Sequence, residues 1–149
     1  MKSLGVAAIC AALLLAAASF PAADKPPLSS AAVTWEEIQA KPSPNGRARQ
    51  VFQSRTATLD ELELHVTTLP AGQESHPPHK HADEEIIIVK EGTVEAVQNG
   101  AVRRLGPGGV LFEASNELHG LKNVGSGPAV YHVIRWTSPG MRARPDGAR

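Results

Sequence analysis

Short apolar or alternating stretches, separated by turn residues, fill the middle of the chain. Leu62, Leu64 and Val66 alternate with polar residues, the period-two pattern of a strand with one buried face. Residues 86–89 are apolar at every position, which predicts a strand buried on both faces. The central region is therefore predicted to be built from β-strands.

Regular turn signals support this prediction. Residues 94–97 and 102–105 flank Asn99-Gly100, a strong signal for a two-residue hairpin. A further strand is expected at residues 110–112 and a last one at residues 129–136. Roughly eight short strands in about 100 residues indicate an antiparallel sandwich or barrel, hence an all-β fold.

The N-terminus has the pattern of an export signal. Met1-Lys2 is followed by an uncharged, Ala- and Leu-rich run at residues 4–18, and polarity begins at Asp24. A run of about 15 residues is short for a membrane span, which needs about 20. We expect residues 1–23 to be a signal peptide, cleaved after Ala18 or near Ala23; the alternative is an uncleaved anchor. The expected location is the periplasm or the exterior.

The remaining chain divides into three parts. Residues 24–50 are expected to form an N-terminal segment with a short helix, in which Thr34 and Glu37 cap the start and Val33 packs against Ile38. Residues 51–137 form the barrel, and residues 138–149 a basic, disordered tail.

Composition excludes several classes of protein. The length of 149 residues suits one domain. Fifteen basic and fifteen acidic side chains balance, so no overall field attracts nucleic acid or an anionic membrane. The single cysteine, Cys10, lies in the expected signal peptide, which excludes a disulfide framework or a Cys-based zinc finger and suits an oxidising compartment.

Histidines suggest the chemistry. All six lie between positions 65 and 132. His79 and His81, one residue apart, project to the same side of an extended backbone, where a carboxylate entering the next strand can meet them. This gives three nitrogen and oxygen ligands suited to a divalent transition metal, with His119 as a fourth candidate. The carboxylate is Glu84 or Glu85, since neighbouring positions on a strand face opposite ways.

Two motifs resemble those of the cupin superfamily. Gly72, His79-x-His81, Glu85 and Gly92 resemble the first motif, and their spacing favours Glu85 over Glu84. Pro107 to Gly109, followed by His119 and Asn123, resembles the second. The resemblance covers roughly residues 60–136. It implies a double-stranded β-helix, the cupin jelly-roll barrel, with His79, His81, Glu85 and His119 as ligands of Fe, Mn, Ni, Cu or Zn.

The pocket beside this metal is expected to be narrow and mostly apolar, because Ile87 and Val89 share the side of Glu85. The polar residues that could line it are His76, Gln73, Asn123 and Tyr131. His65 is expected to face solvent, and His132 to pack in the core.

Three functions fit these residues. The first is a metal-dependent enzyme resembling cupin dioxygenases and oxidases, acting on a small organic molecule, with Glu85 moving a proton. The second is a non-catalytic protein that binds or senses a small molecule, and the third a non-redox isomerase or decarboxylase. Because residues 86–89 are apolar on both faces, a homodimer is also expected.

Overall fold

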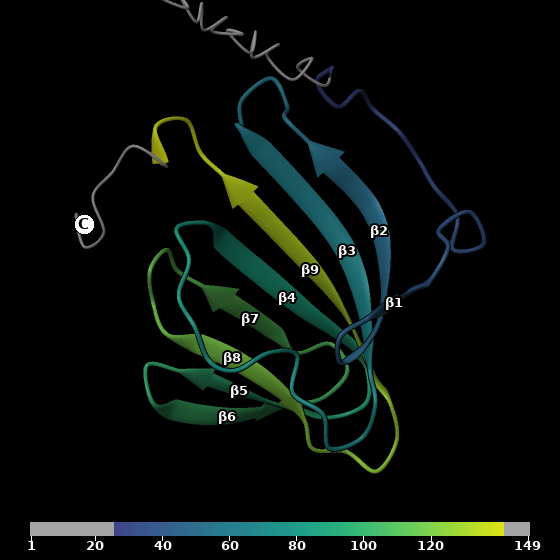
Figure 1. Cartoon of the computed structure of the whole chain (residues 1–149), viewed down its shortest axis with the longest axis vertical. Coiled ribbons are helices and arrows are strands. Elements are labelled where there is room, and N and C mark those ends of the chain that lie inside the picture. The colour runs from purple at the N-terminus through teal and green to yellow at the C-terminus, as the bar shows by residue number, and fades with distance from the viewer. Residues whose placement is uncertain (1–25, 142–149) are drawn as a thin grey trace, which may run out of the picture.

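Two antiparallel sheets form the protein in the computed structural model, which describes residues 26–141 (Figure 1). The strands are β1 (Lys41–Ser43), β2 (Gly46–Ser54), β3 (Glu61–Leu69), β4 (Glu84–Glu91), β5 (Val94–Gln98), β6 (Ala101–Leu105), β7 (Val110–Glu113), β8 (His119–Asn123) and β9 (Ala129–Thr137). Six of them form a sheet in the order β1-β2-β3-β9-β4-β7, and three form a second sheet in the order β6-β5-β8. The predicted all-β jelly-roll barrel is confirmed.

The core lies between the two sheets. It combines Ile87 and Val89 of β4 and Tyr131 of β9, from the larger sheet, with Val94 of β5 and Leu121 of β8 from the smaller one. Because these strands alternate inward and outward, the same inner faces that fill the core also supply side chains to any cavity in it. The expected strand at residues 86–89 is thus the centre of β4. Its burial on both faces was wrong, because Ile87 and Val89 are buried whereas Ile86 is half-buried and Ile88 is exposed on the outer face.

The predicted hairpin joins β5 and β6. Asn99 and Gly100 have φ angles of 49° and 87°, the left-handed conformations that this tight turn requires. Gln98 pairs with Ala101 across the turn, so the register follows directly from it.

The short helix expected at Thr34 is instead a single turn at residues 35–38. One part of the predicted cap is present, because the Thr34 N–H donates to Glu37 Oε2 at 2.6 Å. The helix does not continue because Pro42 lies in β1, only a few residues later, and extended backbone precedes it. The larger sheet therefore begins at Lys41, within the segment expected to precede the barrel.

This N-terminal segment runs beside β2 (Figure 1). The Trp35 ring lies 4.3 Å from the Arg49 guanidinium carbon and 4.3 Å from Lys90 Nζ. Val66, paired with Arg49, is only 2% exposed. The segment thus covers part of the outer face of the larger sheet. The expected signal peptide, residues 1–23, and residues 142–149 of the expected tail lie outside the described residues.

Candidate metal centre

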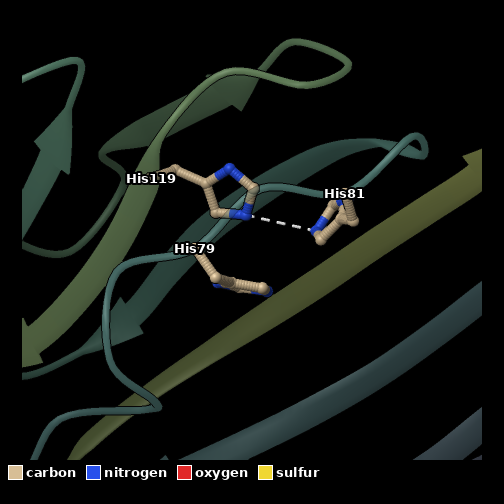
Figure 2. Close-up of side chains that lie close together, drawn as sticks. All are labelled: His79, His81 and His119. Atoms are coloured by element: carbon tan, nitrogen blue, oxygen red, sulfur yellow. Dashed lines mark hydrogen bonds between the residues drawn. The ribbon is translucent and has the colours of Figure 1, made fainter. Parts of the chain in front are cut away.

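Three histidines meet at one end of the core. Their ligand atoms all lie within 4.8 Å of one another. His79 and His81 come from the loop before β4 and His119 starts β8, and the three rings gather in one place (Figure 2). His79 and His119 exchange two backbone hydrogen bonds, of 2.9 and 3.0 Å, which fix the loop against the strand. Residues far apart in the chain are therefore held together by the backbone.

Hydrogen bonds fix the protonation of two of these rings. His81 Nδ1 lies 2.9 Å from the Asp83 carbonyl oxygen, and His119 Nδ1 lies 2.8 Å from that of Glu117. A carbonyl only accepts, so each Nδ1 carries the proton and each neutral ring keeps a lone pair on Nε2. Carbonyl partners of this kind commonly orient metal-binding histidines.

The two lone pairs point at each other. His81 Nε2 and His119 Nε2 are 3.1 Å apart (Figure 2). A hydrogen bond there needs an additional proton, whereas one metal ion accepts both lone pairs. His79 Nδ1 is buried and has no hydrogen-bond partner among the described residues. The donor set therefore fits a divalent transition metal.

Burial favours the neutral form of two of these histidines. It lowers the pKa of His79 to about 4, assisted by the neighbouring His76, His119 and His81. Burial also lowers the pKa of His119, although its bond to the Glu117 backbone opposes this. Neutral imidazole is the form that binds metal, so the site is ready to bind at neutral pH.

The metal-free protein is expected to lose stability as the pH falls from about 6.5 to about 4. In this range His79 binds a proton in the unfolded chain but not in the folded one, so stability rises with pH and is fully present above 6.5. Thermal unfolding in the presence of a chelator measures this. His79→Gln should show a shallower slope over the same range, and an unchanged slope would contradict the assignment.

Glu85, rather than Glu84, faces the histidines. Glu85 is 9% exposed, and its Oε2 lies 3.8 Å from His81 Nε2. Glu84 accepts a hydrogen bond of 3.0 Å from Trp136 Nε1 and is not among the residues that line the cavity. Strand alternation therefore gives the centre one of the two carboxylates.

A second carboxylate, from Glu113, was not predicted. Glu113 in β7 pairs with Glu85 in β4 and is 2% exposed. Its Oε2 lies 3.3 Å from His119 Nε2. Burial, followed by the nearby charge of Glu85, raises the pKa of Glu113 to about 8, so without a cation this carboxyl keeps its proton at neutral pH.

The sequence contains a weak signal for Glu113. Residues 110–113 alternate in exposure, with Leu111 and Glu113 buried and Val110 and Phe112 exposed. Phe112, the aromatic residue of this stretch, is 50% exposed on the outer face. Alternation from the core residue Leu111 would have placed Glu113 inside.

The cavity beside the histidines has a volume of about 300 Å³. Apolar residues such as Ile87 and Leu121 line part of it, as expected, but Glu63, His65 and Arg135 form a polar wall that was not expected. Glu63 is buried and forms an ion pair with Arg135, and it accepts a hydrogen bond from His65, whose Nδ1 lies 3.0 Å from Glu63 Oε1. The hydrogen bond from His65 lowers the pKa of Glu63, and Arg135 adds to the effect. His65 thus lines the cavity rather than facing solvent.

The inward direction of Glu63 and His65 has a structural cause. The expectation for His65 assumed that Leu62, Leu64 and Val66 face the core. They lie on the opposite side of β3 from the cavity residues Glu63 and His65. The outer face is apolar there because the N-terminal segment covers part of it, while the inner face borders the cavity.

The other expected pocket residues lie in different places. His76 and Tyr131 line the cavity. Gln73 lies outside it, at a separate shallow depression. Asn123 is fully buried and supports loops, because its amide donates to the Leu69 and Gly127 carbonyls. His132 is half-buried and does not line the cavity, although it was expected in the core.

The fold and the centre together define a β-barrel with a candidate metal site in its cavity. Residues 65–135 match the model of the Cupin domain family. This range contains all three clustered histidines and both carboxylates. Over these residues the chain is similar to that family.

Solved structures support the same fold. An RmlC-like cupin from Shewanella frigidimarina is 16% identical, with a TM-score of 0.62, over 74% of this chain and 94% of that one. A predicted oxalate decarboxylase from Thermotoga maritima is 20% identical, with a TM-score of 0.59, over 72% and 99%. The polyketide cyclase RemF from Streptomyces resistomycificus is 19% identical, with a TM-score of 0.58, over 74% and 82%.

No curated protein matches the chain. Within residues 26–141, no helix is long and apolar enough to cross a membrane.

Proposed function

We propose that this protein is a metal-dependent enzyme that acts on a small polar organic molecule, with oxidase- or dioxygenase-like chemistry as the first candidate. The observation that carries the proposal is the meeting of His81 Nε2 and His119 Nε2 at 3.1 Å, with His79 beside them, at the wall of a cavity. A site built only for stability would not need a cavity of substrate size next to it.

Each residue has a role in this proposal. His79, His81, His119 and Glu85 hold the metal, which when bound supplies a Lewis acid or a redox centre. Glu85 is the proposed catalytic residue and moves a proton to or from the substrate when its contact with the metal loosens.

The cavity wall indicates the kind of substrate. Glu63, His65 and Arg135 present hydrogen-bonding groups opposite the histidines, and Tyr131 adds a hydroxyl. A volume of about 300 Å³ suits a small molecule. An enediol or a small oxo-acid, able to contact both the metal and this polar wall, fits better than an apolar ligand.

A non-redox isomerase or decarboxylase is the second candidate, because two carboxyl groups lie side by side. Glu85 and Glu113 pair across β4 and β7, and both line the cavity. Such a pair can both donate and accept a proton. This arrangement supports proton transfer without oxidation.

Metal analysis of the natively purified protein, without added metal, tests the proposal first. Near-stoichiometric Fe, Mn, Ni or Cu would support the first candidate, to be followed by oxygen-consumption assays with enediols and oxo-acids. Zinc would favour the second. A folded protein that binds no divalent metal would overturn both, leaving a non-catalytic protein that binds a small molecule.

Two properties of the whole protein extend the proposal. The pattern of residues 1–23 supports export, which N-terminal sequencing of the mature protein would test. The outer face near the sheet edge supports a homodimer, because Val110 and Phe112 are 60% and 50% exposed there, and Phe112 stacks on Trp136 at 6.4 Å. Phe112→Ser should shift sedimentation toward the monomer.

A further inference from the structure

Glu113 is buried without any group that stabilises a charge. It is 2% exposed, and neither carboxylate oxygen has a hydrogen-bond partner among the described residues. Glu113 nevertheless lines the cavity. A carboxyl group in this position either keeps its proton or faces a cation, because burying an unpaired carboxylate is strongly unfavourable.

Glu63 provides the contrast within the same cavity. It is also buried, but it has Arg135 and His65 as partners. The basic side chain that Glu113 approaches is His119, at 3.3 Å, whose Nε2 carries a lone pair because Nδ1 is bonded to the Glu117 carbonyl. Glu63 is therefore satisfied by the protein, whereas Glu113 is not.

Among the described residues, the groups paired with Glu113 or within 3.3 Å of it are Glu85 and His119, and both offer electron pairs. Glu85 is its partner in the register of β4 and β7, and His81 Nε2 lies 3.1 Å from His119 Nε2. These groups repel one another unless protons or a cation lie among them. One cation at this point would compensate all of them at once.

We propose that Glu113 is a fifth protein ligand of the metal, which makes the centre a site of three histidines and two carboxylates. The inference rests on the proposed function. Donors at neighbouring positions of a six-coordinate ion lie about 3 Å apart, given bonds of about 2.1 Å. The separations of 3.1 Å between the two Nε2 atoms and of 3.3 Å between Glu113 Oε2 and His119 Nε2 are close to this value, whereas that of 3.8 Å between Glu85 Oε2 and His81 Nε2 is longer.

A second carboxylate changes which metal the site prefers. Two carboxylates neutralise a divalent cation and leave one position of a six-coordinate ion for substrate. Carboxylate oxygens suit Mn²⁺, whereas imidazoles suit Zn²⁺ and Cu²⁺. Glu113 is therefore expected to increase the affinity for Mn²⁺ more than that for Zn²⁺.

Calorimetric titration of the metal-free full chain with Mn²⁺ and with Zn²⁺ tests the inference. Glu113→Gln keeps the size of the side chain and removes its charge. We expect it to weaken Mn²⁺ binding at least about tenfold, and Zn²⁺ binding by a smaller factor. Glu63→Gln, the matched control from the same cavity, should leave both affinities unchanged.

The outcomes separate this inference from the proposed function. If the wild-type chain binds neither ion, both fail. If it binds Mn²⁺ and Glu113→Gln binds it equally well, Glu113 is not a ligand and the proposed function stands. Equal losses in Glu113→Gln and Glu63→Gln would indicate a general effect of cavity charge and would also overturn the inference.

Thermal unfolding with a chelator distinguishes a ligand from a residue that the fold needs. Glu113→Gln and Glu113→Met should both unfold at the wild-type temperature or higher when metal-free, because each removes a buried acid that lacks a partner. If both variants fail to fold, Glu113 supports the barrel itself and its assignment as a ligand is wrong.

Discussion

His81→Ala is expected to reduce the metal content from near-stoichiometric to almost none. The substitution removes His81 Nε2, one of the two nitrogen atoms whose lone pairs face each other at 3.1 Å. It also removes the contact of 3.8 Å between His81 Nε2 and Glu85 Oε2. The affinity for the metal should fall at least about a hundredfold, because even substitutions of residues that hydrogen-bond to metal ligands weaken metal binding about ten- to a hundredfold. Elemental analysis and metal titration measure the loss.

The fold should survive this substitution. His81 lies in a loop and is half-buried. The free energy of unfolding of the metal-free protein should therefore change by less than about 1 kcal/mol, and its melting temperature should change little. His132→Ala is the control, because His132 does not line the cavity and should retain full metal content. Full metal content in His81→Ala would show that the assigned cluster is wrong.

Gly92→Ala is expected to destabilise the barrel by about 2–4 kcal/mol. Gly92 has a φ angle of 81°, which is unfavourable for alanine, and a Cβ there would lie 2.7 Å from Ala129 Cα and from the Pro128 carbonyl oxygen. Both contacts are with backbone at the start of β9, which cannot move without disturbing the sheet. Chemical denaturation measures the loss.

Gly100→Ala separates the two causes. Gly100 also has a positive φ, of 87°, but a Cβ there would meet nothing within 4 Å. Only the conformational cost of about 1 kcal/mol should remain. If the two variants lose the same stability, the close approach of β9 to Gly92 does not matter.

Local patterns in the sequence predicted most of the fold. Asn99-Gly100 placed the β5–β6 hairpin, and the apolar run at residues 86–89 placed β4, which lies between β9 and β7 in the larger sheet. These features depend on turn chemistry and strand period, which act over a few residues. The prediction of a short helix was wrong because β1 begins only a few residues later. The capping residues Thr34 and Glu37 do not indicate where the next strand begins.

The site was only partly visible in the sequence. His79 and His81 are neighbours in the chain, so their convergence could be expected, and the structure brings His119 to them. Glu113 reaches the centre only through its register with Glu85 across β4 and β7, which sequence spacing does not encode. The polar wall was missed for a similar reason, because the cover on the outer face of β3 decides which side of that strand is apolar.

The backbone bridge between His79 and His119 links the uptake of metal to the folding of the whole barrel. The two residues are separated along the chain by β4, β5, β6 and β7, and β8, which carries His119, pairs with β5. The complete set of donors therefore exists only after both sheets have closed. Uptake of metal by a refolding chain should be a late step, and its rate would time the completion of the barrel.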